Sequence, residues 1–235
     1  MREAVYCATR NLYADMVPAI KSLIMNSSVE RVWLLIEDDS FPYELPDICK
    51  VMNVSGQTFF PQDGVNFKNP WTYMVLMRAA LHRLFPDTDR ILSLDVDTFV
   101  GKDISDIWNT DLDGYYLAAC REPAKSKENF DYINCGVMLM NLAKLRDGKG
   151  DEIIEALNTN DYPFNEQDCI NQLCQGQIKL LSSNYNVSPW TEPPTDPKVV
   201  HFAAIKRYQP QAIYQVFARM RWDDVFKNRL RPEGV

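Results

Sequence analysis

The first hundred residues alternate apolar runs typical of buried strands with segments of helical spacing. The strand-like runs "EAVYCAT" and "RVWLLIED" flank a predicted helix from about Asp15 to Asn26, with Asp15 as its N-cap and Pro18 in its first turn. Two more strands are predicted at "ICKVMNVS" and "RILSLDVDTFV", separated by the helical segment "PWTYMVLMRAALHRLF" with its Pro at the start. This alternation predicts an α/β fold with a mainly parallel sheet, whose ligands bind beyond the carboxyl ends of the strands.

The second half of the chain has a mixed α+β texture. Helices are predicted at "DISDIW" and "NEQDCINQLC", and strands at "GYYLAACRE", "INCGVMLMNL" and, after the Pro-rich loop "SPWTEPPTDPK", at "VVHFAAI". We expect residues 1–206 to form one domain. Residues 207–235 are predicted to be a helical tail packed on that domain, because apolar residues recur there at helical spacing: Ile213, Val216, Phe217 and Met220.

Composition limits the classes of partner and compartment. With 32 acidic and 25 basic residues, the net charge of -7 opposes nonspecific binding to nucleic acid, so no nucleic-acid partner is expected. The six cysteines form no metal-ligand doublet and lie mostly in apolar runs, as buried free thiols do, which fits the cytoplasm. No apolar segment approaches the roughly 20 residues that span a bilayer, and the N-terminus lacks a signal-peptide core. These features predict a cytoplasmic protein without a transmembrane segment.

Two carboxylates, Asp95 and Asp97, follow the apolar run "RILSL". In an extended segment they point the same way while Val96 points back into the protein, and two hard oxygen ligands suit a divalent cation that contacts phosphate. The same letters fit the "DxDxT" of haloacid-dehalogenase-type phosphotransferases, whose first Asp is a nucleophile. That class carries the pair on its first strand, whereas three strands precede it here and no later "GDxxxD"-like segment is present. The position instead favours a nucleotide-sugar transferase.

Five separated segments resemble glycosyltransferase family eight, the retaining transferases that include glycogenin and bacterial galactosyl- and glucosyltransferases. The resemblance covers residues from about 4 to 206 and follows the order of the family. One DxD motif alone would be weak evidence, but an ordered set is specific. It implies a GT-A fold, with a Rossmann-like, mainly parallel sheet and a mixed second half. The segments are "ATRNLY", Arg78, "LSLDVDTFV" with "ISDIWNTDL", "INCGVMLMNL" with "NEQDCIN", and "VVHF" followed by Lys206.

The resemblance implies that Asp95, Asp97 and His201 hold Mn²⁺ or Mg²⁺ against the two phosphates of a UDP-sugar. Taken alone, the pair could be a solvated strand end and His201 a hydrogen-bonded core histidine. The resemblance also implies a set of donor-binding residues: Ala8, Thr9, Asn11 and Tyr13 for uridine, and Arg78, Glu122, Asn134, Gly136, Asp168 and Lys206 for the rest of the donor.

The segment "NEQDCIN" supplies the predicted catalytic residues, Glu166 and Gln167. Acidic residues at a helix start also favour the helix dipole, so a plain cap is the alternative. Two departures from the family stand out. Glu166 occupies a position where Asp is common, and Ala204, near Lys206, replaces a typical glycine in a segment that is one residue shorter than usual.

These inferences predict a metal-dependent retaining transferase that moves glucose or galactose from UDP-glucose or UDP-galactose to a glycan, glycolipid or protein acceptor. One alternative is a catalytically silent relative that binds nucleotide sugars or glycans. Another is a nucleotidyltransferase, which usually needs a Gly-rich loop after the first strand, and the sequence has none.

Overall fold

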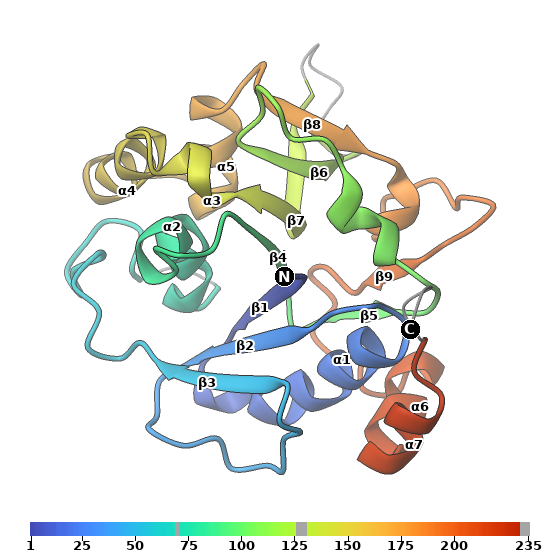
Figure 1. The fold of residues 1–235 in the computed structure, drawn as a ribbon. Coiled ribbons are helices and arrows are strands. Elements are labelled where there is room, and N and C mark those ends of the chain that lie inside the picture. The colour runs from blue at the N-terminus through green and yellow to red at the C-terminus, as the bar shows by residue number, and fades with distance from the viewer. Residues whose placement is uncertain (69–70, 126–130, 231–235) are drawn as a thin grey trace.

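The computed structural model describes residues 1–68, 71–125 and 131–230, and these form a central sheet with helices on both sides (Figure 1). Pro70, the predicted start of the second helix, and residues 231–235 of the predicted tail lie outside the described residues. The strands are β1 (Glu3–Cys7), β2 (Arg31–Ile36), β3 (Cys49–Asn53), β4 (Arg90–Leu94), β5 (Thr98–Val100), β6 (Leu117–Arg121), β7 (Ile133–Asn141), β8 (Ile178–Leu181) and β9 (Val199–His201).

The helices include seven α-helices and several 3₁₀ turns within the described ranges. The α-helices are α1 (Tyr13–Met25), α2 (Leu81–Leu84), α3 (Leu142–Leu145), α4 (Lys149–Thr159), α5 (Asn165–Leu173), α6 (Ala212–Arg219) and α7 (Trp222–Lys227). The 3₁₀ segments are η1 (Arg10–Leu12), η2 (Tyr73–Ala80), η3 (Ser105–Asn109) and η5 (Ser183–Tyr185).

The main sheet has the strand order β3-β2-β1-β4-β7-β6-β8. The four strands from the first half, β3, β2, β1 and β4, are mutually parallel, whereas β7 runs antiparallel to both β4 and β6. The predicted mainly parallel sheet with a mixed second half is therefore confirmed. A separate two-stranded sheet pairs β5 with β9.

Both faces of the central strands β1, β4 and β7 are buried, because their side chains alternate between two apolar cores, whereas the edge strands β3 and β8 are more exposed. On β1, Ala4 and Tyr6 belong to the core that α1, α6 and α7 cover. Val5 belongs to the other core, which η2 and helices α2 to α5 cover. Figure 1 shows these two groups of helices.

Three predictions about helices need correction. Helix α1 begins at Tyr13, and Asp15 lies within its first turn instead of capping it; its carboxylate accepts hydrogen bonds from Gln209 and Tyr214. The segment around residues 73–80 is a 3₁₀ helix. The C-terminal segment forms two helices, and Val216 is 55% exposed although Phe217 is buried as expected.

The pairing of β5 with β9 brings the last strand, with His201, to the carboxyl end of β4. Thr98 lies opposite His201 in this register. The turn between β4 and β5 is held to β7, because the Asp95 N–H donates to the Gly136 carbonyl over 2.9 Å. Residues from three distant segments therefore meet where β4 ends.

Candidate active site

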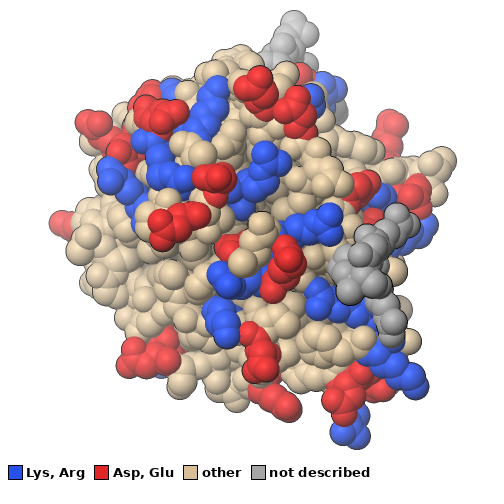
Figure 2. Space-filling view, in the orientation of Figure 1, with Lys and Arg blue, Asp and Glu red and all other residues tan. Residues whose placement is uncertain are grey.

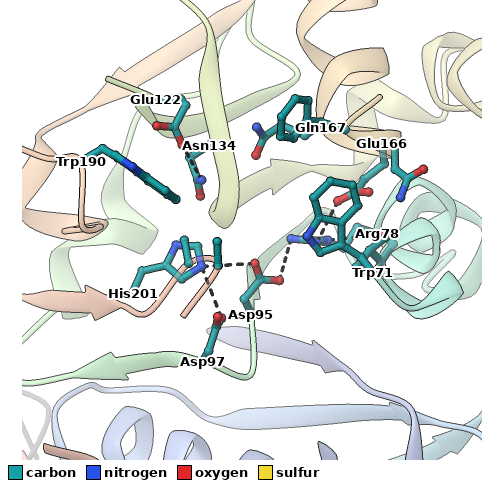
Figure 3. A pocket seen from close by; sticks show the side chains of 15 residues that line it. Trp71, Arg78, Asp95, Asp97, Glu122, Asn134, Glu166, Gln167, Trp190 and His201 are labelled. Atoms are coloured by element: carbon teal, nitrogen blue, oxygen red, sulfur yellow. Dashed lines mark hydrogen bonds and ion pairs between the residues drawn. The ribbon is translucent and has the colours of Figure 1, made fainter. Parts of the chain in front are cut away.

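Asp95, Asp97 and His201 bring three potential ligand atoms within 4.8 Å of one another. His201 Nε2 lies 3.5 Å from Asp95 Oδ2 and 3.3 Å from Asp97 Oδ1 (Figure 3). Adjacent oxygen ligands at about 2.1 Å from Mg²⁺ stand roughly 3 Å apart, so a divalent cation fits this spacing. The two carboxylates lie in a turn, closed by the Thr98 N–H to the Asp95 carbonyl at 3.1 Å. Their convergence comes from this turn and not from the strand alternation that we expected.

Asn186 fixes the orientation of the His201 ring. Its Oδ1 lies 2.8 Å from His201 Nδ1, and its Nδ2 donates to Asn134 Oδ1 over 2.9 Å. Since Asn186 Oδ1 can only accept, His201 donates from Nδ1 and turns Nε2 toward the carboxylates. Metal-binding histidines are commonly held in this way through their second nitrogen.

The site is also shaped electrostatically. Burial alone would lower the pKa of His201, but the charges of Asp97 and Asp95 outweigh it and raise that pKa. Burial would raise the pKa of Asp97, yet the charge and hydrogen bond of His201 bring it below its ordinary value. A divalent cation bound by these groups would compete with protons for the same ligand atoms.

Gly136 provides the space for His201. A Cβ at this position would lie 2.2 Å from His201 Cε1 and 2.6 Å from Nδ1. The resemblance implied that Gly136 is one of the donor-binding residues. The structure places it within β7 directly against the imidazole, where only glycine allows this close approach.

Arg78 joins the carboxylate pair to helix α5. It is 5% exposed, and its guanidinium lies 2.9 Å from Asp95 Oδ1 and 2.8 Å from Glu166 Oε1. A third bond, from Nη1 to the Cys135 carbonyl at 2.6 Å, fixes its plane. Arg78 is therefore a buried charge with two carboxylate partners and one carbonyl partner. Burial raises the pKa of Glu166 to about 7, partly offset by Arg78.

Gln167 borders the cavity with a fixed amide. Its Oε1 accepts the Cys135 N–H at 3.0 Å, and its Nε2 donates to Tyr132 Oη at 3.2 Å. Asp168, a donor-binding residue by the resemblance, accepts hydrogen bonds from Tyr132 Oη at 2.5 Å and from the Phe164 N–H at 2.8 Å, and its contact with the donor stays a prediction. Asp168 fixes the start of α5, and it does not line the cavity among the described residues.

Glu122 and Asn134 lie on the other side of the cavity from Glu166 and Arg78 (Figure 3). Both are buried, and Asn134 Nδ2 donates to Glu122 Oε2 over 2.9 Å. The cavity of about 180 Å³ therefore has carboxylate and amide groups on both sides and the Asp-Asp-His cluster between them.

The predicted uridine residues lie apart from this cavity within the described structure. Ala8 is fully buried and Tyr13 is 2% exposed, with its Oη accepting the Glu37 N–H at 2.8 Å. Thr9 and Asn11 are more accessible and hydrogen bond to each other. Lys206 is exposed and does not line the cavity either. Uridine and phosphate contacts by these residues stay predictions.

Sequence reasoning missed three residues at the site. Asn186 lies in "NYNVS", which carries no distinctive signal. Trp71 and Trp190 line the cavity, and each follows a proline in the sequence, in "NPW" and "SPW". Trp190 lies in the predicted Pro-rich loop, which was an available signal because loops commonly carry binding residues, whereas Trp71 stood at the start of a predicted helix and had no such signal.

The surface agrees with the balanced composition. On the face drawn in Figure 2, acidic and basic side chains are interspersed. Among the described residues, no helix has the length and apolar character needed to cross a membrane.

The fold, with its acidic cluster at the end of β4, is of the GT-A class. The chain belongs to glycosyl transferase family 8, whose model matches residues 4–209. It is 29% identical over 132 residues to a lipopolysaccharide 1,2-glucosyltransferase of Escherichia coli, a match that covers 48% of this chain and 39% of the relative. The matched regions span less than half the length of each of the curated relatives.

Solved glycosyltransferases share the whole fold. The galactosyltransferase LgtC, in complex with donor and acceptor sugar analogues, superposes with a TM-score of 0.73 at 19% identity over 98% of both chains. The glycosyltransferase GlyE of Streptococcus pneumoniae gives a TM-score of 0.75 at 18% identity, over 96% of this chain and 62% of its own.

Proposed function

We propose that this chain is a metal-dependent retaining hexosyltransferase that moves glucose or galactose from a UDP-sugar to a glycan, glycolipid or protein acceptor. The observation that carries the proposal is the convergence of Asp95, Asp97 and His201 beside the buried Arg78–Glu166 pair. Two relatives give it support. The Escherichia coli relative is a lipopolysaccharide glucosyltransferase, and LgtC was solved with donor and acceptor sugar analogues.

Asp95, Asp97 and His201 are the residues that would hold Mn²⁺ or Mg²⁺. The fit rests on the two oxygen ligands and one nitrogen ligand, on the Asn186 bond that directs His201 Nε2 to the cluster, and on the space left by Gly136. When bound, the cation would stabilise the negative charge of the departing diphosphate.

The surrounding residues orient the donor sugar. Arg78 holds Asp95 in place and brings Glu166 to the same wall, while Glu122 and Asn134 offer hydrogen-bonding groups to sugar hydroxyls from the other side. The Gln167 amide lies where positive charge on the reacting carbon could be stabilised. Retention follows either from a covalent glycosyl-enzyme through Glu166 or from front-face attack assisted by the leaving phosphate.

A nucleotide-sugar panel, with and without Mn²⁺, tests this function. We expect metal-dependent hydrolysis of UDP-glucose or UDP-galactose, and loss of metal-dependent UDP binding in calorimetry for both Asp95→Asn and Asp97→Asn. Asp87→Asn is the matched control, because Asp87 is exposed and precedes β4 at its opposite end. Unchanged UDP affinity in the two site variants would contradict the metal assignment. UDP binding without turnover of any donor and acceptor would identify a catalytically silent relative.

A further inference from the structure

Exposed aromatic side chains gather at one cavity. Five aromatic side chains are exposed among the described large hydrophobic residues, and three of the five line the site: Trp71 at 43%, Phe164 at 41% and Trp190 at 48%. They come from separate segments, before η2, before α5 and after η5. Exposed apolar groups that gather around polar ones indicate a binding surface.

Phe164 is held in place on one side of the cavity. Lys125 Nζ lies 3.5 Å from the centroid of its ring, and Lys125 forms an ion pair with Asp168 at 3.0 Å. The rings of Phe164 and Trp71 are 5.6 Å apart with an interplanar angle of 37°. Phe164 therefore packs against both Lys125 and Trp71, which orders the Trp71 ring at the cavity.

Trp71 and Trp190 project from opposite sides of the cavity, on either side of Asp95 and His201 (Figure 3). Their indole N–H groups are available. The other three tryptophans donate to protein acceptors: Trp33 to Glu3, Trp108 to the Glu3 carbonyl and Trp222 to the Glu44 carbonyl. Within the described residues, neither Trp71 nor Trp190 has such an acceptor.

We propose that Trp71 and Trp190 form an acceptor subsite for an uncharged sugar ring. The proposal rests on the proposed function and names its acceptor class as carbohydrate. A pyranose presents apolar C–H groups on its faces and hydroxyls around its edge, which matches an indole with an apolar face and one N–H donor. The charged groups lie between the two tryptophans and around the Asp-Asp-His cluster, where the diphosphate is expected. Lys125, which contacts the Phe164 ring, is paired with Asp168.

Stacking on the donor base is the competing use of these rings, because aromatic side chains also stack on nucleobases. The two uses predict different kinetics. If the rings bind the sugar acceptor, substituting them changes the KM of the acceptor. If they stack on the uracil base of the donor, substituting them changes the affinity for UDP. The predicted uridine residues Thr9 and Asn11 lie outside this cavity, which favours the acceptor.

Steady-state kinetics with the donor from the nucleotide-sugar panel, and with lactose, maltose, methyl β-galactoside and methyl β-glucoside as acceptors, test the subsite. We expect Trp71→Ala and Trp190→Ala each to raise the acceptor KM at least tenfold. Donor KM and donor hydrolysis should stay within twofold, and Trp190→Phe should restore most of the acceptor binding. Phe226→Ala is the matched control, because Phe226 is 39% exposed and lines a separate cavity. An unchanged acceptor KM, or an equal rise in donor KM, overturns the proposal.

Saturation-transfer NMR of the same four sugars, with UDP and diamagnetic Mg²⁺ present, separates this inference from the proposed function. We expect signals with the wild-type chain that disappear in the folded double variant Trp71→Ala/Trp190→Ala. Such signals without turnover of any donor would leave the subsite standing and reject only the transferase. Three outcomes would reject the subsite. They are turnover that is unchanged by both tryptophan substitutions, transfer restricted to a tyrosine peptide or to lipid vesicles, and the absence of a sugar signal with the wild-type chain.

Discussion

At the scale of single residues, the site depends on side chains that are small or fixed by neighbours. For Asp95, Asp97 and His201 to bind one cation together, as proposed, His201 Nε2 must face the two carboxylates. Asn186 sets that orientation by a hydrogen bond, and Gly136 leaves the space that the imidazole fills. Neither residue is itself a ligand, so their effects on metal binding can be tested without removing a ligand.

Gly136→Ala should displace His201, because the added Cβ would lie 2.2 Å from its ring. We expect the affinity for Mn²⁺ to fall by roughly 10- to 100-fold, as it does when the support of a metal-binding histidine is lost. Calorimetry with Mn²⁺ measures the change. Gly56→Ala is the control, since a Cβ at Gly56 meets nothing within 4 Å. Equal affinities in the two variants would show that His201 is not needed for binding.

Gln167→Ala should lower kcat on the order of tenfold or more while the donor Kd stays within a few-fold, because the amide acts mainly in the transition state. The same substitution leaves the Cys135 N–H without its acceptor, so stability should also fall by about 1–3 kcal/mol. Asn171→Ala separates the two effects. Asn171 lies on α5, as Gln167 does, and its side chain hydrogen bonds to the backbone of Ile133 on β7, the strand that contains Cys135. If both variants lose stability but keep wild-type kcat, Gln167 is structural.

At the scale of elements, the loop between β9 and α6 contains a strained backbone position. Ala204 has a φ of 59°, in the left-handed region that L-residues rarely adopt, and it lines the cavity. The sequence indicated this position, because family members typically carry glycine there. Replacing Ala204 by glycine has two opposite effects on stability. It relieves the backbone strain of the folded state, and it raises the entropy of the unfolded state, and the relief of strain is the larger effect.

Ala204→Gly should therefore raise the free energy of unfolding by up to about 1 kcal/mol. Its neighbour Ala203 is not among the residues with positive φ, so Ala203→Gly should lower stability by about 0.5–1 kcal/mol. Urea unfolding of both variants measures the difference. A loss of stability of similar size in both would mean that the conformation at residue 204 is not strained.

At the scale of the whole molecule, a charged network buried between the sheet and α5 links the site to stability. Arg78 connects Asp95, at the end of β4, with Glu166, at the start of α5, so elements from both halves of the chain share one guanidinium. Removing one member leaves the others buried without a full set of partners, which is costly in a low-dielectric interior.

Glu166 should make stability depend on pH. Its pKa is raised to about 7 in the folded protein and is about 4.3 unfolded, so the folded state binds more protons between these values. The contribution of this group to stability is therefore lost as pH rises from about 4.5 to about 7. We expect Glu166→Gln to lack this part of the pH dependence in urea unfolding at pH 5 and pH 7.5 with chelator. The exposed Glu155→Gln should follow the wild type. A Glu166→Gln profile parallel to the wild type would contradict the assignment.

The amino-acid sequence alone predicted the fold class and the residues of the Asp95, Asp97 and His201 cluster. Local apolar periodicity predicted the parallel half, since each strand must bury both faces, and the DxD pair and His201 were visible as residue types in a known order. The sequence also indicated the helix at "NEQDCIN", because apolar residues recur there every three or four positions.

The surroundings of that cluster became visible only in the folded structure. The roles of Asn186, Gly136 and the pair Trp71 and Trp190 depend on contacts between segments far apart in the chain. The hydrogen bonds by which Asp168 holds the start of α5 likewise depend on the fold, while the donor contact that the motif indicated stays a prediction. A sequence motif records which residue types are present, but hydrogen bonding and stacking depend on orientation at distances of a few ångströms, which packing alone sets.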